Sequence, residues 1–352
     1  MAFHIKITAT DHSFDCESDE AVLAAALRQG VSLPYGCRNG ACATCLGKVL
    51  SGEVFYPDGL PMALSEEDHQ SGMALFCQAI PKSDLELEAK EISTEQQIEI
   101  KTLPVRVEAM EKLSGDVMRL CLRLPATERL QFLAGQWIDM LMKDGKRRGF
   151  SIANAPHADD HIELHIRHVV GGVFTDFVFN QLKNNDLLRF EGPHGSFFLR
   201  EDSERPLILI AGGTGFAPLK GILEHAFEAG INRPMHLFWG VRGKKDLYFE
   251  ELPQRWLKEH ENFSYTPVLS EPDATDEWLG ETGFVHEAVV KVYKDLTAYS
   301  VYMAGPPVMI GACKTAFEEQ GLPSDELFFD SFEYSAAAQK AIDAEKQKKG
   351  VS

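Results

Sequence analysis

The stretch Tyr35–Cys45, YGCRNGACATC, places Cys37, Cys42 and Cys45 within nine residues of one another. Small residues fill most of the other positions, which lets backbone N–H groups come close to a bound group. Three thiols this close together suit a zinc site, a disulfide, a redox dithiol or an iron–sulfur cluster. Each of these alternatives makes a different demand on the rest of the chain.

The spacing of a fourth cysteine separates the alternatives. Zinc sites commonly use two C-x2-C pairs, whereas here spacings of four and two residues are followed, after 31 more, by Cys77. This C-x4-C-x2-C…C spacing is typical of plant-type 2Fe–2S clusters. A redox C-x2-C pair is expected beside a helix in a βαβ unit, and this one lies in a loop of a strand-rich segment. The pattern therefore predicts Cys37, Cys42, Cys45 and Cys77 as cluster ligands.

Composition limits the compartment and the partners. The chain has 352 residues, of which 44% are hydrophobic, and a formal net charge of −18. That charge disfavours nucleic acid and anionic membrane as partners. We find neither an apolar run of the ~20 residues that span a bilayer nor the pattern of a signal peptide. We therefore expect a cytoplasmic protein, in which structural disulfides are rare and Cys16, Cys121 and Cys313 are small packed residues.

The rhythm of strands and helices changes along the chain. The first segment alternates short strands with one helix, and a polar stretch at residues 93–101 predicts a linker. Repeated short strands with Gly and Asn turns then predict an antiparallel β-barrel. From Pro206 onward, continuous apolar strands alternate with helices, which predicts a parallel α/β sheet. The expected domains are residues 1–92, 102–202 and 203–334, with a frayed or disordered tail at 335–352.

The cysteine loop and this domain order carry a resemblance to a known family. Residues 1–92 resemble a plant-type ferredoxin with a β-grasp fold, and the following 240 or so residues resemble the ferredoxin–NADP reductase superfamily. The combined order resembles the reductase components of bacterial multicomponent oxygenases and the CDP-6-deoxy-glucoseen reductases. The resemblance implies a chain that uses NAD(P)H, FAD and a 2Fe–2S cluster to transfer electrons.

Residues 147–154, RRGFSIAN, match the R-x-[YF]-S strand that binds flavin in the resembling family. Arg148 suits a pyrophosphate oxygen, because a guanidinium pairs well with phosphate. Phe150 suits the face of the flavin ring. The resemblance places Ser151 at flavin N5, the atom that receives hydride, and so makes it a catalytic candidate.

A second flavin segment runs through Gly171 and Gly172 into a helix that we expect to begin near Thr175. A helix N-terminus with a capping Thr after a glycine turn is suited to an anion. In the family, G-x-x-[ST] holds the flavin phosphates here, which corresponds to Gly172, Val173 and Thr175. A second phosphate site implies FAD more than FMN.

The segment LILIAGGTGFAP, residues 207–218, ends a strand and opens a helix. It departs from the G-x-G-x-x-G fingerprint, and no acid follows ~20 residues later to hold a ribose. The family's GGTGxAP loop is matched in full, and a second family match, AGPPVM, spans Ala304–Met309. The resemblance adds Thr214 to the catalytic candidates. The residues implied for the nicotinamide cofactor are Gly212, Gly213, Thr214, Gly215, Pro218, Gly305, Pro306 and Met309.

The choice between NADH and NADPH stays open. Arg242, Lys244 and Lys245 follow the next strand and suit a 2′-phosphate, although the same residues also suit a solvated basic loop. The resemblance favours NADH, because reductases of this domain order mostly use it.

Three functions are compatible with these motifs. The first is an electron-transfer reductase that serves a partner protein, either an oxygenase or a dehydrase component. The second is a stand-alone flavin or ferric reductase, which leaves the cluster without a purpose, and the third is a zinc-stabilised binding module, which leaves three cofactor loops unexplained. Residues 1–91 carry 14 Asp and Glu against 6 Lys and Arg, a net charge of −8, around a cysteine loop that holds Arg38 and no acid. We therefore expect a partner with a basic docking surface, and we leave the oligomeric state open.

Overall fold

The computed structural model describes residues 2–91 and 98–333, which belong to two compact units. Unit 1 is Met1–Glu99 with Gly195–Phe197, and unit 2 is Ile100–His194 with Phe198–Ser352. The expected tail at 335–352 and most of the expected linker lie outside the described residues. Within the described part of the chain, no helix is long and apolar enough to cross a membrane.

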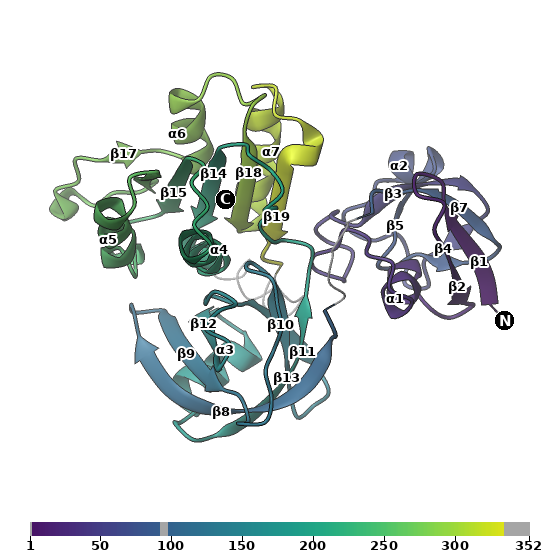
Figure 1. Cartoon of the computed structure of the whole chain (residues 1–352), viewed down its shortest axis with the longest axis horizontal. Helices are drawn as coiled ribbons and strands as arrows, with labels where there is room; N and C mark the ends of the chain where they lie inside the picture. Colours follow the sequence, from purple (N-terminus) through teal and green to yellow (C-terminus); the bar gives the residue numbers. More distant parts are fainter. Residues whose placement is uncertain (1, 92–97, 334–352) are drawn as a thin grey trace. The chain divides into compact units, whose positions relative to one another are not determined.

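Unit 1 is a small mixed sheet with one main helix (Figure 1). The sheet order is β2-β1-β7-β3-β5, with β1 and β7 parallel and the other pairs antiparallel. Its elements are β1 (Ala2–Ile7), β2 (Ser13–Glu17), α1 (Val22–Arg28), β3 (Leu46–Ser51), β4 (Val54–Phe55), α2 (Glu66–Gln70), β5 (Met73–Leu75), β6 (Ile80–Pro81) and β7 (Leu85–Glu88). In β1 the strand alternation buries Ile5 and Ile7 and turns Lys6 outward. This arrangement is the β-grasp fold.

The first part of unit 2 is an antiparallel barrel with the strand order β11-β10-β13-β8-β9-β12. A hydrogen bond from Ala153 N–H to the Glu163 carbonyl oxygen, at 2.8 Å, links the two ends of the sheet and closes the barrel. The linker that the sequence predicted at residues 93–101 extends one residue too far, because Lys101 already belongs to β8. Its elements are β8 (Lys101–Lys112), β9 (Val117–Arg123), β10 (Trp137–Leu141), β11 (Arg147–Ser151), β12 (His161–Arg167), α3 (Val173–Asn180) and β13 (Leu187–His194).

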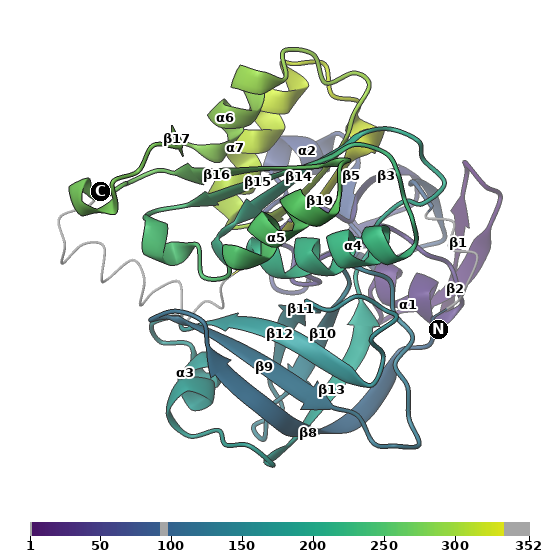
Figure 2. The ribbon, with the colours of Figure 1, turned by 60° about the vertical axis from the view of Figure 1, so that its left-hand side comes forward.

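The second part of unit 2, here called the nucleotide lobe, is a six-stranded parallel sheet in the order β17-β16-β15-β14-β18-β19. Figure 2 shows α4 and α5 on one face of the sheet and α6 and α7 on the other. The elements are β14 (Leu207–Gly212), α4 (Phe216–Glu228), β15 (Met235–Val241), α5 (Glu251–Glu259), β16 (Phe263–Leu269), β17 (Glu281–Thr282), α6 (Val285–Val292), β18 (Ser300–Gly305), α7 (Pro307–Glu318) and β19 (Leu327–Ser331).

The strand order of this sheet places a ligand crevice. Every residue of β14 is buried, as a strand covered on both faces requires. The chain runs from β14 to β15 on one side, and returns to β18 on the other. Ligands of open α/β sheets bind beyond the carboxyl ends of the strands at such a switch point. The crevice therefore opens beside Gly212 and Gly305.

Candidate functional site

The cysteine loop of unit 1 has an unusual backbone. Arg38, Gly40 and Ala43 have φ values of 60°, 79° and 59°, in the left-handed region. Non-glycine residues persist there only where the surroundings impose the conformation, often at functional sites. A Cβ at Gly40 would lie 2.7 Å from the Cβ of Pro61, so the loop packs closely on the segment before α2.

The four predicted ligands lie together at this loop. Cys42, Cys45 and Cys77 are buried, and Cys37 is partly buried. The Cys37 N–H donates to Cys42 Sγ at 3.4 Å, and Cys45 and Cys77 share a hydrogen bond between their side chains. Cys77 reaches the loop because the Phe76 N–H donates to the Cys45 carbonyl oxygen at 3.2 Å.

Backbone and side-chain donors surround these sulfurs. The backbone N–H groups of Asn39 and Ala41 point at Cys37, and that of Gly40 points at Cys77. The hydrogen bond from Cys37, followed by that from the Thr44 hydroxyl, lowers the pKa of the Cys42 thiol despite its burial. N–H donors aimed at thiolate ligands are a normal part of an iron–sulfur site and tune its potential. The donor set therefore fits a 2Fe–2S cluster.

The flavin strand is β11, and it holds Arg148, Phe150 and Ser151 in sequence. The Phe150 ring lies 5.2 Å from that of Phe174, between ring centroids. Ser151 Oγ donates to Asp330 Oδ2 at 2.9 Å. Asp330 is on the last strand, β19, so the barrel and the nucleotide lobe meet at the candidate catalytic serine. The sequence motifs did not include Asp330. The segment FFDSF, residues 328–332, resembles the family's final strand and was a usable signal.

The expected N-cap role of Thr175 is wrong. Helix α3 begins at Val173 with Gly172 at the N-cap, and Thr175 is its third residue, only 9% exposed. Its hydroxyl accepts from the Val169 N–H at 3.2 Å and donates to the Gly172 carbonyl oxygen at 3.0 Å. A Cβ at Gly172 would lie 2.6 Å from Thr175 Oγ1, so glycine is required here. Gly172, Val173 and Thr175 therefore form one compact turn, held by the Thr175 hydroxyl.

The two nicotinamide motifs meet at the switch point. A Cβ at Gly215 would lie 1.8 Å from the Ala304 carbonyl oxygen, and one at Gly212 would lie 2.5 Å from Met309 Sδ. Gly305 in turn lies against Gly212, with Pro306 beside them. Thr214 lies in the 3-10 turn Gly213–Gly215, and Pro218 is in the first turn of α4. Two segments about 90 residues apart in the sequence therefore pack backbone against backbone at this point.

Arg167 lies beside this turn. A Cβ at Gly213 would be 2.9 Å from Arg167 Nη1. Within the described residues, Arg167 Nε and Nη2 are buried and make no hydrogen bond, and Nε has only an ion pair with Asp116 at 3.4 Å. A guanidinium with unused donors at a glycine turn suits a phosphate group. This orphaned donor pair fits the dinucleotide that the motif implies.

The basic loop after β15 also contains carboxylates. Arg242 is exposed, and its Nε lies 3.9 Å from Asp246 Oδ2. Lys244 donates through its backbone N–H to Asp276 Oδ2 and through Nζ to the Asp276 carbonyl oxygen, both at 3.3 Å. These carboxylates reduce the positive potential that the loop offers to a 2′-phosphate.

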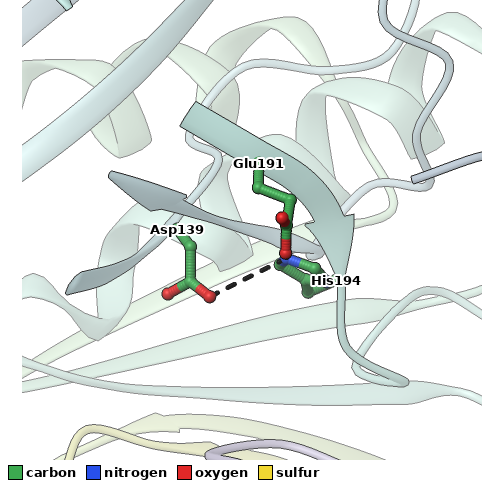
Figure 3. Close-up of side chains that lie close together, drawn as sticks. All are labelled: Asp139, Glu191 and His194. Atoms are coloured by element: carbon green, nitrogen blue, oxygen red, sulfur yellow. Dashed lines mark ion pairs between the residues drawn. The ribbon is translucent and has the colours of Figure 1, made fainter. Parts of the chain in front are cut away.

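A further charged group lies on barrel strands β10 and β13, on the face that points away from the barrel core, and the sequence predicted no site there. Figure 3 shows Asp139, Glu191 and His194 directed toward one another from β10 and β13. His194 Nε2 lies 3.8 Å from Asp139 and 3.6 Å from Glu191. Arg147 forms an ion pair with Glu191 and lies 4.0 Å from Asp139. The Arg147 guanidinium supplies the counter-charge, so these residues form an ionic cluster on the outer face of the barrel.

Three family profiles match the chain in the order of its parts. A 2Fe-2S iron-sulfur cluster binding domain matches residues 5–82, an oxidoreductase FAD-binding domain matches 104–199, and an oxidoreductase NAD-binding domain matches 209–315.

Relatives match the whole described architecture. The chain is 39% identical to the CDP-6-deoxy-L-threo-D-glycero-4-hexulose-3-dehydrase reductase of Yersinia pestis, over 94% of this chain and 99% of the relative. It is 36% identical to the reductase component DmpP of phenol 2-monooxygenase from Pseudomonas sp. (strain CF600), over 96% of both chains.

The chain belongs to the iron–sulfur flavoprotein reductases of the ferredoxin–NADP reductase superfamily.

A solved structure of this family, the Amycolatopsis cytochrome P450 reductase GcoB, has a TM-score of 0.78 at 35% identity and covers 94% of this chain and 98% of its own. Phthalate dioxygenase reductase shares the fold, with a TM-score of 0.54 at 21% identity over 66% of this chain and 69% of its own. The chain is thus an NAD(P)H-dependent oxidoreductase of this family. It carries electrons through FAD and a 2Fe–2S cluster to a partner protein.

Proposed function

We propose that this reductase takes electrons from NADH and delivers them singly to either an oxygenase component or a dehydrase. The observation that carries this is the pairing of two sites in one chain. Unit 1 gathers four thiols under backbone N–H donors, and unit 2 joins the flavin strand to the nucleotide lobe through Ser151 and Asp330 of β19. A stand-alone flavin or ferric reductase would use only unit 2 and would leave the cysteine loop without a role.

The cofactors supply the redox chemistry: when bound, the dinucleotide provides a hydride, the flavin accepts it, and the cluster handles single electrons. This chain positions them. Arg148 would pair with the flavin pyrophosphate, Phe150 would lie against the ring, and the Ser151 hydroxyl would serve the reacting edge. The turn of Gly172, Val173 and Thr175 receives the flavin phosphates. Cys37, Cys42, Cys45 and Cys77 hold the cluster.

The nicotinamide turn of Gly212, Gly213, Thr214 and Gly215 receives the dinucleotide together with Gly305, Pro306 and Met309, and Pro218 opens the helix behind it. Thr214 and Ser151 are the two side chains that would contact the reacting rings. These three cofactor sites divide the chain into a ferredoxin domain at 1–92, a flavin domain at 102–202 and a nucleotide domain at 203–334. The reduced thiols that a cluster requires favour a cytoplasmic location.

The preference for NADH rests on the loop after β15. Asp246 and Asp276 lie among its cations, and a 2′-phosphate would meet these carboxylates as well as Arg242. We expect kcat/KM for NADH to exceed that for NADPH at low ionic strength. A higher kcat/KM for NADPH would assign Arg242, Lys244 and Lys245 to the 2′-phosphate instead.

The nature of the acceptor is tested with a basic protein. Cytochrome c is a suitable surrogate, because unit 1 is acidic and opposite charges steer association by roughly 10-fold or more. NADH should reduce it, and the rate should fall as salt shortens the screening length from about 10 Å at 0.1 M. NADH oxidation that reduces only ferric chelates or free flavin, with no reduction of cytochrome c, would favour the stand-alone reductase.

A further inference from the structure

One barrel strand carries three polar side chains that meet the nucleotide lobe. Glu163, His165 and Arg167 alternate along β12 and therefore share one face of the strand. Glu163 Oε1 lies 3.2 Å from Lys220 Nζ of helix α4. His165 Nδ1 lies 2.9 Å from the Tyr248 hydroxyl, and Arg167 lies against the nicotinamide turn at Gly213.

Glu163 and Lys220 form a buried ion pair. Glu163 is 2% exposed and Lys220 is 5% exposed, although charged residues are rarely buried unless they are paired. Burial acts to raise the pKa of Glu163, but the hydrogen bond from His165 and the charges of Lys220 and Arg119 outweigh it and lower the pKa. Burial lowers the pKa of His165. A neutral His165 fits both partners, since its Nε2–H donates to Glu163 at 2.9 Å and its Nδ1 accepts from Tyr248.

Lys220 also contacts the flavin strand's end of the junction, by which we mean the contact between the barrel and the nucleotide lobe. Its Nζ donates to the Ala153 carbonyl oxygen at 3.1 Å, and Ala153 is two residues beyond Ser151. At the next position, a Cβ on Gly221 would lie 3.0 Å from the Asn154 carbonyl oxygen, so α4 packs backbone-close to this segment. One ammonium group thus connects α4 both to β12 and to the end of the flavin strand.

The position of Lys220 in α4 couples this contact to the site. The nicotinamide turn ends at Gly215, five residues before Lys220, which is about 7.5 Å along a helix. A shift or tilt of α4 therefore moves the turn directly. Hydride transfer is sensitive to such movement, because a misplacement of about 1 Å can slow a reaction about 100-fold.

We propose that Glu163 and Lys220 are positioning residues for hydride transfer, which fix α4 and the nicotinamide turn against the flavin strand. This inference rests on the proposed function. Neither residue belongs to a motif that binds a cofactor, and both act through the backbone that they hold. A buried ion pair is costly to desolvate. An apolar contact would hold the barrel and the lobe together equally well. It would not fix the position of α4 along its axis, because apolar contacts are not directional.

The test is Lys220→Met in the full-length holoenzyme. Three quantities are measured: bound FAD by absorbance, the Kd of ADP-ribose by calorimetry, and the rate of flavin bleaching at saturating NADH by stopped flow. We expect FAD content and Kd within about twofold of wild type, and bleaching about 10-fold to 100-fold slower. The isotope effect with deuterated NADH should rise, because the hydride step becomes more fully rate-limiting.

Two further variants make the result specific. Lys220→Arg should restore most of the rate, because a cavity of about 270 Å³ beside Lys220 leaves room for the longer side chain. Lys291→Met removes the 2.8 Å ion pair with Glu281 on the surface of the same lobe and should bleach at the wild-type rate.

Glu163→Gln gives an independent check if Lys220→Met folds poorly. It should also slow bleaching, and the double variant should be no slower than the slower single variant, as expected for residues that act as a pair. Bleaching at the wild-type rate in both single variants, or a loss no larger than their loss of FAD or ADP-ribose binding, would overturn the proposal. If the wild-type flavin is not bleached by NADH, the proposed function itself fails, whatever the variants do.

Discussion

The cysteine loop of unit 1 and the lobe junction of unit 2 build their sites in opposite ways. In the loop, three of the four ligands fall between Cys37 and Cys45, and the backbone itself is forced into left-handed conformations. In the junction, ordinary strands and a helix bring together Ser151, Glu163, Lys220 and Asp330. The loop site depends on local backbone geometry, whereas the junction depends on tertiary packing. A single substitution should therefore remove the first site outright and misalign the second.

The largest expected effect concerns the loop. Cys77→Ser should reduce bound iron and labile sulfide, expected at two of each per chain, by at least about tenfold, because it removes a ligand outright. Cys121→Ser is the control. Cys121 lies on β9 of the barrel, where burial raises the pKa of its thiol, and this variant should keep the full cluster. Zinc bound by the four thiols, with no iron present after anaerobic preparation, would refute the cluster assignment.

The next effect concerns the tightest contact of the nicotinamide turn. Gly215→Ala would place a methyl group 1.8 Å from the Ala304 carbonyl oxygen, so the backbone of one motif must move. We expect weaker binding of ADP-ribose and hydride transfer slowed about 100-fold. In Gly311→Ala, on α7, the new Cβ would have no described atom within 4 Å, and a helical alanine is favoured over glycine by about 1 kcal/mol. Equal hydride-transfer rates in the two variants would contradict the packing of the two motifs.

A smaller effect separates two residues of the flavin site. Ser151→Ala should slow flavin reduction about 100-fold with little change in FAD content, since it removes the hydroxyl that we propose serves the reacting atom and that contacts Asp330. Thr175→Val should instead weaken FAD retention roughly tenfold, because it removes the hydroxyl that ties Val169 to Gly172. FAD content and stopped-flow bleaching measure both. If the two phenotypes are exchanged, the roles are wrong.

The smallest effect is a dependence on pH that is specific to unit 2. Burial lowers the pKa of His236 on β15 from 6.5 to about 4, so the unfolded chain binds this proton more readily. The stability that His236 contributes is complete above pH 6.5 and declines as the pH falls toward 4. The melting temperature followed by flavin fluorescence should therefore fall between pH 7 and pH 5.

His236→Gln should flatten that dependence, and His286→Gln on α6 is the matched control. The unfolding of unit 1, followed by the visible signal of the cluster, should not change in either variant. A pH dependence that His236→Gln leaves unchanged would place its origin in other groups.

The sequence was informative where chemistry is local. The cysteine spacing, the GGTGxAP turn and the R-x-F-S strand are each contiguous, so their residue types and spacing carry the geometry. The parallel sheet was also predictable, because β14 is a continuous apolar run, as expected for a strand that is buried on both faces.

The tertiary contacts of the site could not be predicted from the sequence. The start of β8 was assigned to the linker, because Pro104 and frequent charges obscure an alternation that buries Leu103, Val105 and Val107. The Thr175 hydroxyl was assigned to a cap because residue type alone does not show where a helix begins. Asp330 and the Glu163–Lys220 pair look like ordinary surface charges in sequence, and only the packing of the lobe on the barrel buries the pair and partly covers Asp330.

The most direct test of the account compares two acceptors in one variant. Wild-type and Cys77→Ser proteins are given NADH with either cytochrome c, a one-electron protein acceptor, or dichlorophenolindophenol, a two-electron dye. If electrons leave through the cysteine loop, Cys77→Ser should keep dye turnover within about twofold and lose cytochrome c turnover by at least about tenfold. Cytochrome c turnover at the wild-type rate in a variant that lacks the cluster would show that the loop is not on the electron path.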